Sequence, residues 1–208
     1  MSVPRIAIVD YRTGNLRSVE KGFEAAGVQG VGVTDDPSQV ENARGIVLPG
    51  VGAFRDAAAN LRASGMWDVV VSRARAGTPL LGICLGMQLL ATTGLEDGEW
   101  GGLGLVPGVC TRLTGPVKVP HIGWNTVETP RPSPLFRDTP SGSAFYFVHS
   151  YHLAPEDPEA VIGVTEYGTR FASAVRSGSV FGVQFHPEKS SAAGLALLGA
   201  FARIVEEA

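Results

Sequence analysis

Cysteine is scarce in this sequence, which has two, Cys84 and Cys110, in 208 residues. Such scarcity gives no sign of a disulfide-stabilised secreted fold. The segment from Met1 to Asp10 lacks the basic residues, the apolar stretch and the small-residue cleavage site of a secretion signal. We therefore expect the protein to be located in the reducing cytoplasm.

An excess of charge of one sign is also missing. The chain has 17 Lys and Arg residues and 20 Asp and Glu residues, a formal charge of −3, and no long run of either sign. Binding to nucleic acid or to an acidic membrane surface therefore has no electrostatic support. The composition favours a small ligand or another protein as the partner.

Long hydrophobic runs are absent except for one uncharged stretch, residues 78–95. A membrane-spanning helix needs about 20 consecutive apolar residues. Proline, glycine and polar residues interrupt this stretch, namely Pro79, Gly82, Gly86, Gln88, Thr92 and Thr93. We therefore interpret it as a buried strand, a tight turn and a helix, and we predict no membrane span. The sequence also has no internal repeat, low-complexity tract or heptad pattern.

Short apolar runs alternate with longer helical patterns in the first half of the chain. We expect strands at residues 5–9, 28–34, 45–48 and 78–83. Helical spacing follows the first strand and ends at Gly27, and further helices are expected at residues 53–64 and 67–76. This alternation predicts an α/β fold with an open, mostly parallel central sheet and flanking helices.

Beyond about Leu103 the pattern changes to short extended segments rich in Gly, Pro and Thr. These segments predict additional antiparallel strands near residues 109–113, 145–149, 160–166, 172–176 and 180–185. A final helix from about Ala193 would place its apolar face against the sheet. Because no linker interrupts the sequence, we expect residues 1–208 to form a single domain.

The most informative stretch is Gly82-Ile-Cys84-Leu-Gly86, in which two glycines flank a cysteine between an apolar strand and a helical pattern. This is a cysteine version of the nucleophile elbow, a turn so sharp that side chains at the glycine positions would collide. The start of the following helix would stabilise a reactive thiolate. The alternative is an ordinary buried cysteine on a core strand, because free cysteine is often buried. Cys110 lacks this frame and is interpreted as structural.

A cysteine nucleophile needs a base and a group that orients the base. His186-Pro187-Glu188 offers both, because an extended chain would point His186 and Glu188 to the same side. A surface histidine and glutamate just past a strand end is the alternative. His149 and His152 lie close in sequence, but no cysteine or carboxylate falls at a metal-ligand spacing from them. We therefore predict no metal site.

Amide hydrolysis also needs hydrogen-bond donors for the oxyanion of the tetrahedral intermediate. The segment Gly50-Val51-Gly52 follows the third expected strand, at the sheet edge where open α/β folds bind their ligands. It is our candidate for the oxyanion hole. A phosphate-binding loop is the rival interpretation, but the sequence has neither the dinucleotide-binding pattern nor the lysine-bearing P-loop pattern.

Together these motifs resemble those of the class I glutamine amidotransferases, in which Gly82-Ile-Cys84-Leu-Gly86-Met-Gln88 matches the nucleophile motif and His186 and Glu188 match the rest of the triad. Within this family the resemblance is greatest to the glutaminase subunits of imidazole glycerol phosphate synthases. The other matching segments are Asp10-Tyr11, Gly14-Asn15, Pro49 to Phe54, Pro120 to Asn125, His149 to His152 and His186 to Ser190. The resemblance implies a flavodoxin-like fold and covers nearly the whole chain.

The resemblance implies that Cys84 attacks glutamine, forms a glutamyl thioester and releases ammonia. Ammonia would pass to a cyclase subunit with a (β/α)₈ barrel fold, which forms imidazole glycerol phosphate and an aminoimidazole carboxamide ribotide in histidine biosynthesis. No cofactor is implied. The residues expected at glutamine are Gln88, Glu96, Ser150 and Tyr151. Those expected at the partner interface are Asn15, Trp124, Asn125 and Lys189.

Two other classes of function stay open: a stand-alone cysteine hydrolase or peptidase, and a non-catalytic α/β module that keeps the elbow. A non-catalytic module would be expected to have lost a member of the triad, whereas this sequence retains all three. We also predict low glutaminase activity without the partner, through an inactive arrangement of the peptide near Val51. Arg12 departs from the small residues that the family has between Tyr11 and Gly14.

Overall fold

The computed structural model describes residues 3–208, and its centre is a seven-stranded sheet with the strand order β11-β12-β13-β4-β3-β1-β2. The strands of this sheet are β1 (Ile6–Val9), β2 (Val31–Thr34), β3 (Gly45–Gly50), β4 (Leu80–Cys84), β11 (Val161–Tyr167), β12 (Thr169–Ser177) and β13 (Val180–Val183). Neighbouring strands from β13 to β2 pair in parallel, whereas β11 and β12 add an antiparallel edge. The predicted open, mostly parallel α/β sheet is therefore confirmed.

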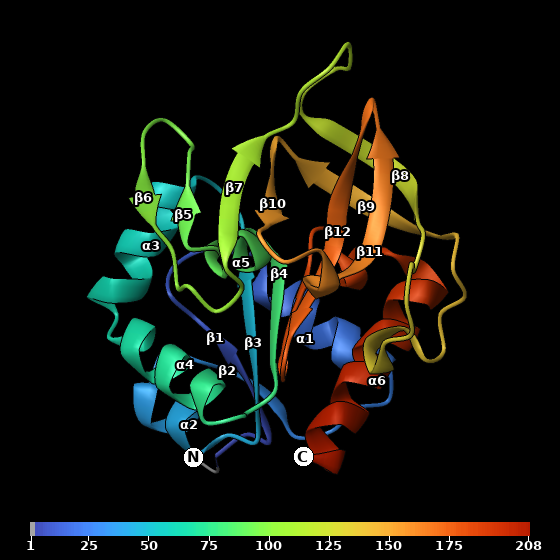
Figure 1. The fold of residues 1–208 in the computed structure, drawn as a ribbon. Helices are drawn as coiled ribbons and strands as arrows, with labels where there is room; N and C mark the ends of the chain where they lie inside the picture. Colours follow the sequence, from blue (N-terminus) through green and yellow to red (C-terminus); the bar gives the residue numbers. More distant parts are fainter. Residues whose placement is uncertain (1–2) are drawn as a thin grey trace.

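Helices cover both faces of this sheet (Figure 1). One face carries α1 (Leu16–Ala25) and α6 (Ser191–Glu207), and the other carries α2 (Pro37–Asn42), α3 (Phe54–Ala63) and α4 (Met66–Arg75). Side chains of β1 alternate between the faces, so that Ile6 and Ile8 join one core and Ala7 and Val9 join the other. Because both faces are buried, β1 is apolar at every position, as parallel strands usually are.

The remaining strands lie beyond the carboxyl ends of the central strands (Figure 1). One group is a four-stranded sheet of β10 (Tyr151–Pro155), β7 (Gly108–Arg112), β5 (Thr93–Gly94) and β6 (Trp100–Gly101), and the other is an antiparallel pair of β8 (His121–Val127) and β9 (Ser143–His149). Short 3₁₀ turns are η1 (Pro134–Phe136), η2 (Pro158–Ala160) and η3 (Pro187–Lys189). Between the two layers lies α5 (Leu85–Leu89), which follows β4 directly.

Some expected boundaries are corrected. The second strand starts at Val31 and not at Val28, because the N–H of Val28 closes the end of α1 on the carbonyl of Phe23. Gly30, with φ of 73°, then turns the chain into β2. The last strand ends at Val183 because the chain leaves the sheet just before η3.

Apart from the 3₁₀ turns, five elements are missing from the sequence-based expectations, namely α2, β5, β6, β8 and β10. The start of α2 carries a recognisable signal, since Asp36 accepts a hydrogen bond from the N–H of Ser38 at 2.9 Å and Pro37 takes the first helical position. Its six residues are too few to show helical periodicity. The uncharged stretch 78–95 contains the predicted strand and helix, β4 and α5, joined by the sharp turn at Cys84, and also the short strand β5. Within residues 3–208 no helix has the length and apolarity needed to cross a membrane.

Candidate active site

Cys84 stands at the junction of β4 and α5, with φ of 55° and ψ of −110°. This conformation is strained for a residue with a side chain, and such strain often marks functional sites. A Cβ atom at Gly82 would lie 2.8 Å from the carbonyl oxygen of Gly86, and one at Gly86 would lie 1.7 Å from that of Leu48. The predicted need for glycine on both sides of the cysteine is therefore confirmed.

His186 and Glu188 meet as the sequence predicts. His186 Nδ1 lies 2.8 Å from Glu188 Oε1, and both side chains are almost fully buried. A carboxylate can only accept, so Nδ1 donates and the ring is held in one orientation. The backbone N–H of His186 donates to the carbonyl of Tyr146 at 2.9 Å, which ties this residue to β9.

Besides its interaction with His186, the thiol of Cys84 makes two hydrogen bonds. It donates to the carbonyl of Val148 at 3.8 Å, and the Gln184 amide donates to the sulfur at 3.8 Å. Burial lowers the pKa of His186, but its interactions with Cys84 and Glu188 outweigh burial and raise the pKa to about 10. His186 is therefore placed beside the sulfur, where it can take up and return a proton.

The segment Gly50-Val51-Gly52 runs from the end of β3 along the mouth of the same site. A Cβ atom at Gly50 would lie 2.4 Å from the hydroxyl of Tyr11, and that hydroxyl donates to the carbonyl of Pro49 at 2.6 Å. Gly52 has φ of 100°, which favours glycine. The segment is therefore anchored at Gly50, whereas Val51 and Gly52 are exposed.

Two functional groups next to Cys84 escape the sequence analysis. Leu85 is the first residue of α5, where N–H groups have no partner inside the helix, and nucleophile elbows take one oxyanion donor from the residue after the nucleophile. That signal was present in the elbow motif itself. Gln184 is completely buried and contacts both Cys84 and Gln88, but its position reads as an ordinary strand residue.

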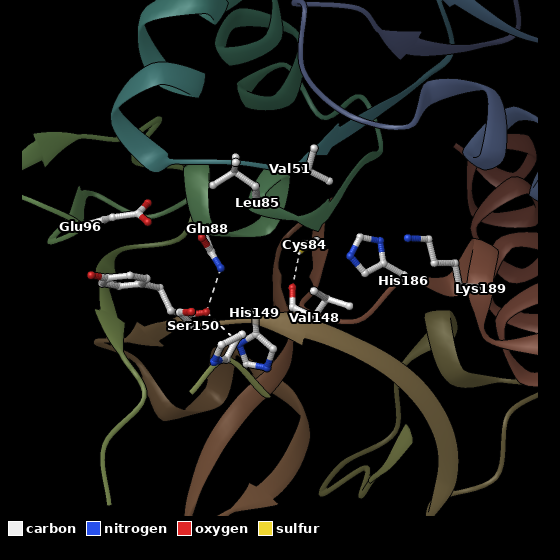
Figure 2. A pocket seen from close by; sticks show the side chains of 13 residues that line it. Val51, Cys84, Leu85, Gln88, Glu96, Val148, His149, Ser150, His186 and Lys189 are labelled. Atoms are coloured by element: carbon white, nitrogen blue, oxygen red, sulfur yellow. Dashed lines mark hydrogen bonds between the residues drawn. The ribbon is translucent and has the colours of Figure 1, made fainter. Parts of the chain in front are cut away.

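A pocket of about 290 Å³ opens beside Cys84 (Figure 2). Its lining includes Val51, Gly52, Cys84, Leu85, Gln88, Glu96, Ser150, Tyr151, His186 and Lys189. All four residues expected at glutamine thus border one pocket. Figure 2 shows Glu96 beyond Gln88 at one end and His186 beyond Cys84 at the other. A ligand that reaches from the thiol to Glu96 would be small and elongated.

The polar residues of the pocket wall are held by further hydrogen bonds. Gln88 Nε2 donates to the carbonyl of Tyr151 at 2.8 Å and to Gln184 Oε1 at 3.2 Å. Glu96 Oε2 accepts from the N–H of Phe54 at 2.7 Å. Within residues 3–208 no group donates to the side-chain oxygen of Gln88 or to the second oxygen of Glu96, so both can accept from a ligand.

The four residues expected at the interface lie in different settings. Trp124 is 54% exposed on β8, with its ring 6.1 Å from that of Tyr146. Asn125 is turned inward and donates to the carbonyl of Glu166 at 2.9 Å. Asn15 is exposed at the start of α1, and Lys189 is exposed while bordering the pocket.

Of the other histidines, His121 and His149 are buried and lie against each other, and His152 is partly buried nearby. His121 Nδ1 lies 3.1 Å from His149 Nε2, and the ring of His152 packs near Phe171. In the part of the chain that the structure describes, no group of three His, Cys, Asp or Glu side chains is arranged to hold a metal.

Comparisons with known sequences match nearly the whole chain. A family model described as glutamine amidotransferase class-I matches residues 7–202. The chain is 53% identical over 203 residues to "Imidazole glycerol phosphate synthase subunit HisH" of Moorella thermoacetica, an alignment that covers 98% of this chain and 96% of the relative. It is 47% identical to the subunit of the same name from Syntrophotalea carbinolica, with 94% and 98% covered.

Solved structures share the fold at lower identity. One titled "Crystal structure of glutamine amidotransferase" superposes with a TM-score of 0.77 at 18% identity, covering 97% of this chain and 99% of that one. The structure of PurLQS from Thermotoga maritima gives a TM-score of 0.71 at 20% identity, with 99% and 97% covered. The structural likeness supports the fold, and the sequence matches show that the chain belongs to the glutamine amidotransferase class-I family.

Proposed function

We propose that this chain is the glutaminase subunit of an imidazole glycerol phosphate synthase and acts in the cytoplasm. The observation that carries the proposal is the position of Cys84, His186 and Glu188 at one end of a pocket whose other end holds Glu96. The relatives named as subunits of that synthase, which align over nearly their whole length, support it.

In the proposed reaction the Cys84 thiolate attacks the carboxamide carbon of glutamine. The carbon–nitrogen bond breaks, His186 gives its proton to the leaving nitrogen, and ammonia departs from a glutamyl thioester. Water then attacks the thioester while His186 takes its proton, and glutamate leaves as the thiolate re-forms. Glu188 keeps the ring of His186 oriented through both steps, because it holds Nδ1 at 2.8 Å.

The oxyanion of each tetrahedral intermediate needs N–H donors close to Cys84. We assign this role to the Gly50-Val51-Gly52 segment together with the N–H of Leu85, since Val51, Gly52 and Leu85 border the pocket. The exposure of Val51 and Gly52 leaves this segment free to change its peptide orientation. Low activity without the partner follows if the partner sets that orientation.

The opposite end of the pocket suits the amino-acid end of glutamine. The second oxygen of Glu96 would pair with the ammonium group, and the backbone of Ser150 and Tyr151 would hold the carboxylate. Gln88 presents its side-chain oxygen, because both hydrogens of its amide are used by Tyr151 and Gln184. These contacts would favour a free amino acid over an internal peptide segment.

A partner surface lies next to the pocket. Large apolar side chains are exposed there, with Ile122 at 61% and Trp124 at 54% on β8 and Val148 on the neighbouring β9. Val148 also borders the pocket, and its carbonyl accepts from Cys84. We propose that a cyclase subunit with a (β/α)₈ barrel fold docks here, with Asn15, Asn125 and Lys189 nearby, and receives the ammonia.

Glutamate release tests the proposal directly. The purified chain is assayed with glutamine alone and with the cyclase subunit carrying its nucleotide ligand, using Cys84→Ala and, as the matched buried control, Cys110→Ala. We expect strong stimulation by the cyclase that is lost in Cys84→Ala and kept in Cys110→Ala. High activity without the cyclase would favour a stand-alone hydrolase, and no glutamate in any mixture would favour a non-catalytic module.

A further inference from the structure

A series of three hydrogen bonds connects β8 to the Ser150–Tyr151 backbone, which forms one wall of the pocket. Asn125 Nδ2 lies 3.4 Å from His121 Nε2, and His121 Nδ1 lies 3.1 Å from His149 Nε2. His149 Nδ1 in turn lies 2.9 Å from the carbonyl oxygen of Tyr151. The series starts beside the exposed Trp124 and ends on a residue that borders the pocket.

The direction of every hydrogen bond in this series follows from the carbonyl oxygen of Tyr151 at its end. A carbonyl oxygen can only accept, so His149 Nδ1 carries the hydrogen. In a neutral ring His149 Nε2 then accepts, and His121 Nδ1 must donate to it. His121 Nε2 is left to accept from the amide of Asn125. Every donor therefore points towards the pocket.

The surroundings keep both rings neutral. His121 is 3% exposed, with its ring centroid 4.0 Å from that of Tyr167 and 4.8 Å from that of Phe147. His149 is 5% exposed and lies against Phe171. Burial lowers the pKa of both histidines. Both nitrogens of His149 are occupied by protein contacts, which leaves neither for a metal ion or for a proton transfer to the ligand.

The carbonyl of Tyr151 holds both the side chain of Gln88 and the Ser150–Tyr151 backbone in place. It accepts from Gln88 at 2.8 Å as well as from His149 at 2.9 Å. Gln88 continues through Gln184 to the sulfur of Cys84. A shift of this carbonyl would therefore move the Gln88 amide and the backbone wall together.

We infer that His149 is a positioning residue that fixes the Tyr151 carbonyl, and with it Gln88 and the Ser150–Tyr151 wall, in the geometry that binds glutamine, and that His121 holds the ring of His149 in the tautomer that donates to this carbonyl. The same contacts link this wall to β8, the strand that carries Trp124. The inference rests on the proposed glutaminase function, and it assigns to these histidines a role in substrate binding rather than in the chemical step.

Two substitutions at His149 separate positioning from simple packing. The amide nitrogen of asparagine can occupy the place of Nδ1, so His149→Asn keeps the donor to Tyr151 and loses the bond to His121. The amide of glutamine reaches the place of Nε2, so His149→Gln does the reverse. Ser173→Ala is the matched control, because Ser173 is a completely buried polar residue whose hydroxyl bonds Thr165, outside the pocket.

Glutamate release is measured for each variant in complex with the cyclase. We expect His149→Gln to raise KM for glutamine by about tenfold, the effect of one lost hydrogen bond to a binding element, with a smaller change in kcat. His149→Asn and Ser173→Ala should stay within about threefold of the unsubstituted protein. An equal rise in KM for both His149 variants, or no rise in either, would overturn the inference. Failure of the unsubstituted complex to release glutamate would instead overturn the proposed function.

Nitrogen NMR of the unsubstituted protein gives a second readout that does not depend on activity or on the folding of a variant. Long-range correlations between ring hydrogens and ring nitrogens distinguish the two neutral tautomers from the imidazolium form. We expect His149 and His121 both to carry their hydrogen on Nδ1 near neutral pH. A hydrogen on Nε2 of His149, or a protonated ring, would contradict the assigned direction of the hydrogen bonds.

Discussion

The carboxylate of Glu96 accepts a hydrogen bond of 2.7 Å from the backbone N–H of Phe54. Phe54 is the first residue of α3, directly after the loop that contains Gly52, so Glu96 joins one end of the pocket to the candidate oxyanion segment. A carboxylate at a helix N-terminus is also favoured by the helix dipole. One oxygen of Glu96 therefore makes a structural hydrogen bond, and the other is available to accept from the ligand.

Substitutions of Glu96 should separate these two contacts. Glu96→Gln removes the charge but leaves an oxygen for the N–H of Phe54, so KM for glutamine should rise by about tenfold or more, the scale of a lost charged hydrogen bond. The free energy of unfolding should change by less than about 0.5 kcal/mol. Glu96→Ala should cost about 1 kcal/mol in addition, because the N–H of Phe54 loses its acceptor. An unchanged KM in Glu96→Gln would show that the substrate ammonium binds elsewhere.

Gly86→Ala should destabilise the fold by at least about 3 kcal/mol, because the added Cβ atom would lie 1.7 Å from the carbonyl oxygen of Leu48 in the neighbouring strand. Backbone atoms leave no flexible side chain to move aside. The control is Gly27→Ala, where φ is 78° and no atom of residues 3–208 lies within 4 Å of the added Cβ, so about 1 kcal/mol of conformational strain is expected. Urea unfolding measures both values. Equal losses would mean that the elbow can relax around an added methyl group.

Much of this arrangement could be predicted because its causes are local. Apolar runs such as that of β4 reflect burial on both faces of a parallel sheet, and the glycines around Cys84 reflect one tight turn. The pairing of His186 with Glu188 depends on two residues separated by one proline. In each case a few neighbouring residues suffice to specify the geometry.

The contacts that could not be predicted depend on pairing between distant strands. Gln184 reaches Cys84 because β13 lies beside β4 in a register that pairs Val183 with Ile83. That register joins residues one hundred positions apart, and no local pattern encodes it. His121 meets His149 for the same reason, since β8 and β9 place them opposite each other. A sequence pattern of strands leaves such side-chain partners undetermined.

Acid should destabilise the protein below about pH 6.5. Burial is the main cause that lowers the pKa of His149 from 6.5 to about 3, so in this range the unfolded chain binds a proton that the folded chain does not. The stability due to neutral His149 is therefore complete above pH 6.5 and is lost as the pH falls towards 3, by up to about 1.4 kcal/mol per pH unit. Burial lowers the pKa of His121 and His152 as well, which adds to the effect.

Urea unfolding at several pH values between about 7 and 5 measures this dependence. The slope of unfolding free energy against pH should be smaller in His149→Asn, which cannot take up the proton. His186 acts in the opposite direction, since its pKa is raised to about 10 and its contribution is complete below pH 6.5 and lost as the pH rises. An identical slope in the substituted and unsubstituted proteins would contradict the assignment to His149.

Trp124→Ala should weaken binding of the cyclase subunit by at least about 2 kcal/mol, because an exposed tryptophan next to the pocket mouth has the character of an interface hot spot. Trp124 is 54% exposed, so removing its ring should change the stability of the isolated chain little. The control is Val3→Ala, which removes a side chain of similar exposure, 49%, near the amino end of β1 and far from β8 (Figure 1). Titration calorimetry with the cyclase measures both affinities. An equal loss of affinity in Val3→Ala would show that the effect of Trp124→Ala is not specific to β8. Unchanged binding of Trp124→Ala would place the docking surface away from β8, and the path of ammonia would then have to leave the pocket on another side.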